Sequence, residues 1–281
     1  MKLSLSVRVA ESFNDKTKAD MTLEQLAELA VTFGYHAVCM RASQLGTHSS
    51  AEEVQRAGEM MARRGLAVSM VTGDFAIPQN GDVEGPRALR NITPYLDLSA
   101  ALGADLMRIC MKRSEDIQWA QRAADEAAER GIRLAHQSHT SSLFEEVERS
   151  LEVIRGVDRP NFGLIYEPVN LDACGQDYGR NTIELLAPHL FNVYLQNHIE
   201  NPQGEGVLNT WCRGAVHFDH LPVWAPGGMN FPKIFDALKA VGYEGYVTVH
   251  QAFAGLRGPA EAAERSSAYL RELACFENPL S

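Results

Sequence analysis

Short apolar segments alternate with longer amphipathic segments along the whole chain. The apolar segments have the length of buried strands, and the segments between them show the spacing of surface helices. Eight strands are expected, at 3–9, 36–41, 66–72, 105–111, 132–136, 162–166, 191–195 and 245–249. Strict alternation predicts a parallel sheet, because parallel neighbours need a long crossover that is usually a helix.

Capping signals mark the beginnings of the expected helices. A small polar residue followed three positions later by Glu or Gln predicts a helix N-terminus. This spacing occurs at Thr22, Ser50, Ser142 and Asn181. Pro259 suits the first position of a last helix, where a backbone N–H would have no helical partner in any case.

The number of strand–helix units distinguishes a barrel from an open sheet. A chain of 281 residues with eight such units has the size of a single α/β barrel. An open doubly wound sheet would be expected to carry a glycine-rich phosphate loop, and the sequence has neither a G-x-G-x-x-G nor a Walker motif. We therefore predict one (β/α)8 TIM barrel spanning residues 1–281, with no nucleotide cofactor.

The overall charge and the cysteine pattern indicate which partners and which cellular compartment to expect. A net charge of -10 disfavours nucleic acid, which needs a basic face. No apolar run is long enough to span a bilayer, so we expect no membrane partner. The five cysteines are widely spaced and form no C-x-x-C pair, which favours a reducing cytoplasm over a disulfide framework.

One segment departs from the alternation. Residues 199–230 follow the seventh expected strand and show no clear period. Long irregular segments in a compact domain are often lids or binding loops. Aromatic residues such as Trp211 and Trp224 argue against disorder. We therefore predict that this segment is a lid or a subunit interface within the barrel domain.

Polar side chains of ligand and acid–base types stand at the ends of four expected strands, where the active sites of parallel barrels lie. They are Gln137 and His139, Glu167, Gln196 and His198, and His250. Side chains two positions apart share one face of a strand. An acid at the end of an apolar strand would be costly without a partner. We expect Glu167, His139 and His250 to converge in one cavity as the catalytic residues.

These strand ends resemble the xylose isomerase-like superfamily of sugar phosphate isomerases and epimerases. Three stretches are typical of it: 131–135 (GIRLA), 160–164 (PNFGL) and 242–246 (GYEGY). The resemblance covers nearly the whole length and implies a TIM barrel. It also implies a divalent metal among a glutamate on strand five, an aspartate on strand six, a histidine on strand seven and a glutamate on strand eight.

The residues at those four positions depart from the family pattern. In order, they are Gln137, Glu167, Tyr194 and His250. The resemblance then implies a metal held by Glu167, His250 and Gln137, with manganese, zinc or iron favoured over magnesium because a nitrogen donor has replaced a carboxylate. Two other interpretations stay open. One is metal-free catalysis by Glu167 and a histidine, and the other is a binding pocket without catalysis.

Further residues are interpreted as contacts to the substrate. They are Arg8, Arg41, Arg108, Tyr194, Gln196, His198 and Trp211. A buried arginine needs an anion or a carboxylate partner. The three arginines therefore either bind a carboxylate or phosphate of the substrate or pair with internal acids such as Glu11 and Asp74.

The predicted function is isomerisation or epimerisation of a sugar, a sugar acid or a related polyhydroxy carbonyl compound. A base would remove the proton next to the carbonyl, and the resulting enediolate would be reprotonated. One alternative is a lyase or dehydratase, which begins with the same proton removal and then expels a β-substituent. Another is a non-catalytic sugar-binding barrel. We expect a small-molecule polyhydroxy substrate and a homo-oligomer.

Overall fold

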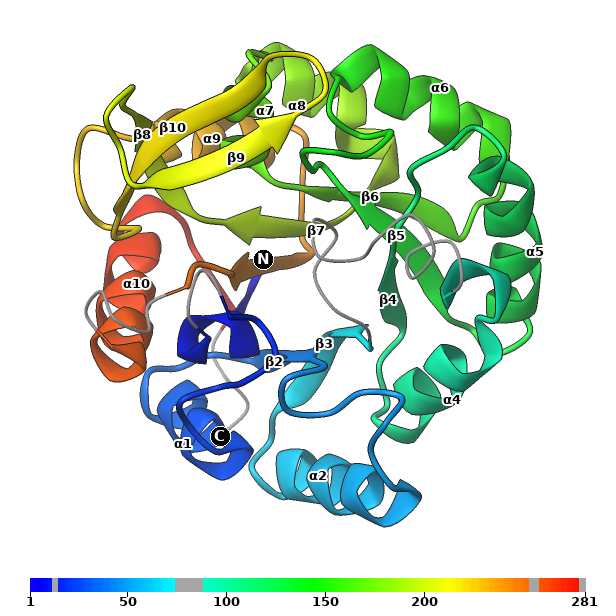
Figure 1. Cartoon of the computed structure of the whole chain (residues 1–281). Helices are drawn as coiled ribbons and strands as arrows, with labels where there is room; N and C mark the ends of the chain where they lie inside the picture. Colours follow the sequence, from blue (N-terminus) through cyan, green and yellow to red (C-terminus); the bar gives the residue numbers. More distant parts are fainter. Residues whose placement is uncertain (12–14, 74–87, 253–257, 278–281) are drawn as a thin grey trace.

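The computed structural model describes residues 1–11, 15–73, 88–252 and 258–277. Eight parallel strands close into a barrel in the order β1-β11-β7-β6-β5-β4-β3-β2, which confirms the predicted (β/α)8 fold (Figure 1). The barrel strands are β1 (Lys2–Ser6), β2 (Ala37–Arg41), β3 (Ala67–Thr72), β4 (Leu106–Ile109), β5 (Arg133–Gln137), β6 (Phe162–Tyr166), β7 (Leu190–Leu195) and β11 (Tyr246–Val249).

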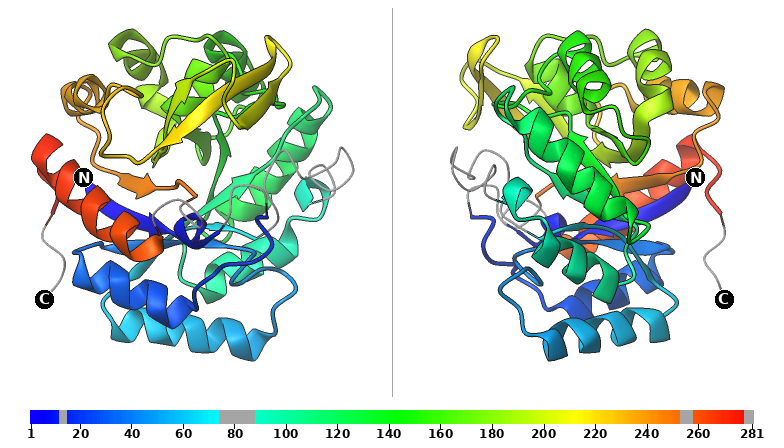
Figure 2. Two further views of the ribbon diagram at one scale, coloured as in Figure 1. Left: turned by 60° about the vertical axis from the view of Figure 1, so that its left-hand side comes forward. Right: turned by 90° about the vertical axis from the view of Figure 1, so that its right-hand side faces the viewer.

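The helices form the outer layer around these strands (Figure 2). They are α1 (Leu23–Thr32), α2 (Ala51–Arg63), α4 (Thr93–Ala101), α5 (Asp116–Ala128), α6 (Val147–Val157), α7 (Pro168–Ala173), α8 (Arg180–Leu186), α9 (Phe231–Ala240) and α10 (Pro259–Leu273), with short 3₁₀ helices η1 (Val7–Ala10) and η2 (Ala187–His189). The expected capping boxes form in full at Thr22 and Ser50. None of the helices that the structure describes has the length and apolarity that crossing a membrane requires.

Side-chain alternation along the strands builds two layers inside the barrel. The first is an apolar cluster of Cys39, Met70, Leu106, Ala135, Ile165 and Tyr194. Two positions further along the same strands stand Arg41, Thr72, Arg108, Gln137, Glu167 and Gln196. Because residues two apart share a face, the apolar layer directly supports a polar layer at the carboxyl ends of the strands.

The segment after β7 is not irregular, so that part of the expectation for 199–230 is wrong. It forms an antiparallel sheet in the order β8-β10-β9, from β8 (Asn197–Glu200), β9 (Gly206–Thr210) and β10 (Gly214–Leu221). Figure 1 shows this sheet in yellow-green to yellow beside α7. β8 and β9 have only four and five residues, and polar and apolar residues mix along all three strands, so the segment shows little recognisable period.

The sheet is fastened to the barrel by a carboxylate whose role differs from the one expected. Helix α6 begins at Val147, and Ser142 and Glu145 do not form the predicted capping box. Instead, buried Glu145 accepts N–H bonds from Ser141 at 2.5 Å, from Trp211 at 2.8 and 2.9 Å and from Cys212 at 3.0 Å. Glu145 therefore joins the loop after β5 to the β9–β10 hairpin turn.

A second connection holds the chain that follows the sheet. The Asn197 side chain donates to the carbonyl oxygens of Pro222 and Ala225, each at 3.0 Å, and accepts from the Met229 N–H at 2.8 Å. Gln251, just after β11, donates to the Leu221 carbonyl at 2.5 Å. These hydrogen bonds hold the segment that follows β7 against the carboxyl end of the barrel.

We expect Glu145→Gln to destabilise the protein by about 2 kcal/mol, because an amide has one acceptor oxygen and would turn its NH₂ towards a backbone donor. The measurement is chemical unfolding, with limited proteolysis at the hairpin as a local readout. The exposed neighbour Glu146 supplies the control, Glu146→Gln. Equal stability of the two variants would contradict the role given to Glu145.

Candidate active site

A cavity opens at the carboxyl end of the barrel, with an empty volume of about 590 Å³ up to its mouth. Its described lining consists of Arg8, Lys16, Arg41, Arg108, Gln137, His139, Val169, Asn170, Gln196, Asn197, His198, Leu208, Phe218, His220 and His250. The structure thus brings most of the sequence-predicted site residues to one cavity, and Glu167 lies directly beneath its amide-bearing wall.

Glu167 is the buried carboxylate of the site. It accepts hydrogen bonds at Oε2 from the side-chain amides of Gln137 and Asn170, and at Oε1 from Gln196 at 2.5 Å. All three amides line the cavity. Burial raises the pKa of Glu167 from 4.5 to about 7, and the bonds from Gln137 and Gln196 offset part of this effect. The carboxyl group therefore changes its protonation state near neutral pH.

His139 and His250 are held as neutral rings. His139 donates from Nδ1 to the Thr140 carbonyl at 2.7 Å, which leaves the lone pair on Nε2. Burial lowers the pKa of His139 to about 3. The His250 Nδ1 lies 3.0 Å from the Ser6 hydroxyl, and burial, followed by the charges of Arg41 and Arg8, lowers the pKa of His250 well below its usual value. Both rings remain uncharged at neutral pH.

Two of the expected substrate contacts lie elsewhere. Tyr194 is fully buried under the site, where its ring stacks on His250 with centroids 3.7 Å apart and its hydroxyl lies 3.3 Å from the Cys39 sulfur. Trp211 sits in the hairpin turn, is 57% exposed and does not belong to the described cavity lining. Glu145 accepts the Trp211 backbone N–H, and Trp211 lies beside Ser142 and Leu143 instead.

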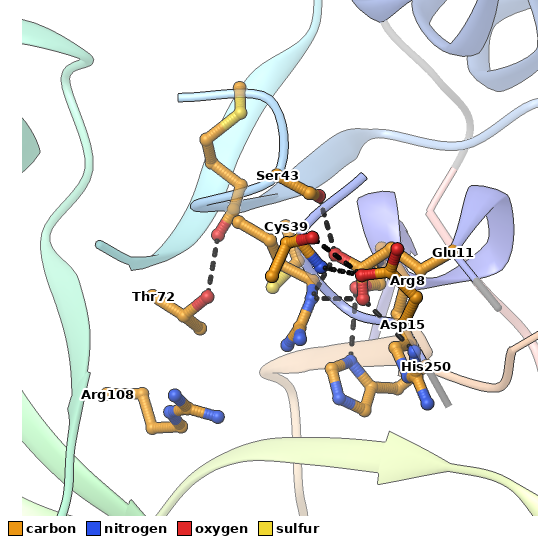
Figure 3. Close-up of polar contacts among 12 residues, drawn as sticks. Arg8, Glu11, Asp15, Cys39, Ser43, Thr72, Arg108 and His250 are labelled. Carbon is orange, nitrogen blue, oxygen red and sulfur yellow. Dashed lines mark hydrogen bonds and ion pairs between the residues drawn. The ribbon is translucent and has the colours of Figure 1, made fainter. Parts of the chain in front are cut away.

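Arg8 and Arg41 both pair with one internal acid. Arg8 Nη1 lies 3.1 Å from Glu11 Oε2 (Figure 3). Arg41 Nε lies 2.9 Å from Glu11 Oε1. Burial alone would raise the pKa of Glu11, but the Arg41 charge and hydrogen bonds hold that pKa below its usual value. The second acid suggested by the sequence, Asp74, lies outside the described residues. Arg8 and Arg41 therefore pair with Glu11 and also line the cavity.

The third arginine approaches from another side. Figure 3 shows the Arg108 guanidinium pointing from β4 towards the region of Arg8 and His250. Its Nη1 lies 3.5 Å from Gln137 Oε1. This contact orients the Gln137 amide, with its oxygen towards the cation and its nitrogen towards the Glu167 carboxylate.

Sequence reasoning missed several lining residues. Leu208, Phe218 and His220 come from the antiparallel sheet, which was not predicted, and they supply the wall that was expected from Trp211. Lys16 comes from the segment between η1 and α1, where no periodic pattern marks it. Burial, then repulsion by Arg8 and Arg41, lowers the pKa of Lys16 to about 7. The Lys16 amine is therefore poised between its charged and neutral forms.

His198 forms a dyad with a carboxylate from a neighbouring helix. Its Nε2 lies 3.3 Å from Asp172 Oδ2 on α7, and its ring packs against Phe218 with centroids 5.0 Å apart. Helix α7 begins directly after Glu167. The same short helix therefore orients a histidine of the cavity wall and connects to the buried acid.

The donor set at the family's metal position does not fit a divalent cation. The Gln137 oxygen, an expected ligand, faces Arg108, and the Glu167 oxygens already accept three amide N–H bonds. Another group of described residues, Glu145, Cys174 and Cys212, has ligand atoms within 4.8 Å of one another. Its carboxylate is engaged by backbone N–H groups, and burial raises the pKa of the Cys174 thiol well above its usual value.

Comparisons with known proteins extend these observations. A model of the family described as "Xylose isomerase-like TIM barrel" matches residues 27–273. An inosose dehydratase of Geobacillus thermodenitrificans is 25% identical over 156 residues, which cover 54% of this chain and 51% of that protein. The chain thus matches about half the length of this curated relative.

Solved structures share the fold at low identity. A protein described as a probable 3-DHS dehydratase from Bacillus anthracis is 14% identical, with a TM-score of 0.73 and coverage of 96% of this chain and 99% of that one. A D-allulose 3-epimerase from Methylomonas sp. is also 14% identical, with a TM-score of 0.64 and coverage of 97% and 98%. Epimerases and dehydratases therefore both occur among proteins of this fold.

We expect Glu167 to titrate near pH 7. Because the folded pKa exceeds 4.5, the unfolded chain loses this proton first, and the stability contributed by this group should fall as pH rises from about 4.5 to about 7. Carboxyl ¹³C NMR of glutamate-labelled protein, assigned with Glu167→Gln, measures the titration. A midpoint near 4.5 would show that burial does not govern this group.

Proposed function

Because the chain belongs to the xylose isomerase-like TIM barrel family, we propose that it is an isomerase or epimerase that moves a proton next to the carbonyl group of a small polyhydroxy compound. The observation that carries this proposal is the Glu167 carboxyl group, with its pKa near 7 under the cavity wall. A general base works best when its pKa is near the operating pH. The D-allulose 3-epimerase among the proteins of the same fold is consistent with this reaction class.

Glu167 is the proposed base, and Gln196 is the side chain that controls access to it. Gln137 and Asn170 hold Oε2 and are almost fully buried, whereas Gln196 holds Oε1 and is only half-buried. A rotation of Gln196 would expose Oε1 to a substrate C–H bond. The proton removed there would return to the adjacent carbon in an isomerase. In an epimerase Glu167 would keep that proton, and a second acid of the cavity would deliver another proton to the opposite face of the same carbon.

Neighbouring groups would stabilise the enediolate. Negative charge develops on the carbonyl oxygen as the proton leaves, and fixed donors aimed at that oxygen lower the barrier. Arg108 carries positive charge on the cavity wall, and His139 presents a neutral ring with its lone pair on Nε2. We assign Arg108 to charge stabilisation and the His139 Nε2 to accepting a hydrogen bond from a substrate hydroxyl.

Elimination of water is the second candidate. Loss of a β-hydroxyl group needs an acid to protonate it, and Lys16, with a pKa near 7, supplies one in the same cavity. The similarity to an inosose dehydratase favours this candidate as well. A dehydratase that used ionised Glu167 and protonated Lys16 would show a bell-shaped pH profile centred near pH 7.

Incubation with a panel of keto-sugars and keto-acids in D₂O tests the proposal and separates the two reactions. Incorporation of deuterium with a new stereoisomer or ketose–aldose pair, seen by NMR, indicates isomerisation or epimerisation. Loss of the mass of one water indicates elimination. Neither exchange nor product on the whole panel would count against an enzyme and in favour of a binding barrel.

We expect Glu167→Gln to lower the rate of deuterium exchange by about 10² to 10⁴, the usual contribution of a positioned base. The matched control is Glu244→Gln, because Glu244 is exposed and precedes β11 at the opposite end of the barrel. An exchange rate in Glu167→Gln equal to that of the control would remove Glu167 from the mechanism.

The pH dependence of kcat/KM should follow the protonation state of Glu167. The base acts in its ionised form, so kcat/KM for isomerisation should rise with pH and level off above about 7, the pKa of Glu167. Below that pH the rate should fall about tenfold per unit. Initial rates between pH 5 and 9 give the profile, and a flat profile across pH 6 to 8 would contradict it.

A further inference from the structure

We propose that this cavity binds its substrate through an anionic group, a carboxylate or a phosphate, and works without a divalent metal. This inference rests on the proposed function, because it names the substrate class for the same cavity. It follows from the charges and the topology of the cavity wall rather than from the family, whose pattern implies a cation at this place.

The cavity wall is basic. Arg8, Lys16, Arg41 and Arg108 all line it, and none of the lining residues that the structure describes is acidic. One described carboxylate behind the wall is Glu11, which is shared by Arg8 and Arg41. Four basic side chains thus gather on one cavity wall, and this concentration of positive charge favours an anion.

Mutual repulsion among these groups is visible in their protonation. After burial, the charges of Arg8 and Arg41 are the next causes that lower the pKa of Lys16. An anionic group bound among them would relieve this repulsion, and a divalent cation would increase it.

The order of the strands around the barrel places Arg41 and Arg108 across the cavity from Glu167 and His250. In the closed order, β2 stands across from β6, and β4 stands across from β11. Arg41 at the end of β2 therefore faces Glu167 at the end of β6, and Arg108 on β4 faces His250 after β11. A substrate in the cavity would hold its anionic group on the β2–β4 side and its reacting carbon towards Glu167, so that Arg108 contacts both the anionic group and the carbonyl oxygen.

The arginine geometry suits an oxyanion. Arg41 contacts Glu11 through Nε, which leaves the two Nη groups of its planar fork for a second anion. Arg108 reaches the Gln137 oxygen from Nη1 at 3.5 Å, a long contact that a carboxylate or phosphate oxygen would readily replace. Lys16 adds a point charge from the segment before α1.

The basic cavity wall supplies the positive charge that a metal would otherwise provide. A divalent ion stabilises the developing oxyanion of an enediolate, and fixed cationic donors in a water-excluded site have the same electrostatic effect. The expected ligand Gln137 instead bridges Arg108 and Glu167. The two carboxylates that the family pattern places on strands five and eight are here an amide and an imidazole, so the site has lost anions where a metal needs them.

Binding measurements on the full chain, after exhaustive chelation, test this inference independently of turnover. Isothermal titration with malonate and with inorganic phosphate should show saturable binding that weakens with salt, and the tighter of the two identifies the anion type. Manganese and zinc chlorides should show no saturable binding that depends on Glu167. Saturable manganese or zinc binding that Glu167→Gln abolishes, or no binding of either anion, would overturn the proposal.

Variants locate the subsite. Arg108→Met and Lys16→Met should each weaken anion binding by about tenfold or more, with circular dichroism confirming the fold. Lys18→Met is the matched control, because Lys18 is exposed two positions from Lys16. Anion affinities unchanged in both variants would refute the assignment. Turnover of a neutral keto-sugar without competition by either anion would refute this inference and leave the proposed function standing, whereas anion binding without any turnover would do the reverse.

Discussion

A barrel strand places only every second side chain inside the barrel, and the whole site depends on this constraint. The apolar layer from Cys39 to Tyr194 fills the interior, so the next inward position on each strand is forced to the carboxyl end. There the sequence has polar and charged residues, and they meet whether or not they attract one another. The packing of the apolar layer determines the positions of Arg41, Arg108 and Glu167. The ion pairs and hydrogen bonds of the polar layer must suit those positions.

Internal pairing is one part of that adaptation. Buried Glu11 lies between Arg8 and Arg41 and also accepts a hydrogen bond from Ser43 at 2.5 Å. Removing one partner of such a buried pair leaves an uncompensated charge, which is strongly destabilising. Amides are the other part, because Gln137 turns its oxygen to Arg108 and its nitrogen to Glu167. The neutral Gln137 side chain thus lies between the Arg108 cation and the Glu167 carboxylate in the same polar layer.

The sequence predicted these strands because alternation and strand-end chemistry are local patterns. It also predicted that Glu167, His139 and His250 converge at the carboxyl end of the barrel, since all three stand at strand ends, and His139 and His250 do line the cavity. It failed where partners come from distant segments. Glu145 has the spacing of a capping box but binds a hairpin turn 66 residues away, and Lys16 lies in a segment without a period. Tyr194 was assigned to the substrate, although a tyrosine one inward position below the polar layer can only support it.

The departures from the family pattern form one consistent change rather than four separate losses. An amide at 137 tolerates both Arg108 and Glu167, whereas a carboxylate there would repel the ionised Glu167 carboxylate and raise its pKa further. An imidazole at 250 stays neutral because Arg8 and Arg41 lower its pKa, whereas a carboxylate would pair with those arginines and occupy them. Each replacement keeps the cations of the wall available and leaves Glu167 as the single titratable acid of the polar layer among the described residues. Charge balance therefore couples the neutral side chains at 137 and 250 to the basic wall, because a carboxylate at either position would change the charge that Glu167 and the arginines experience.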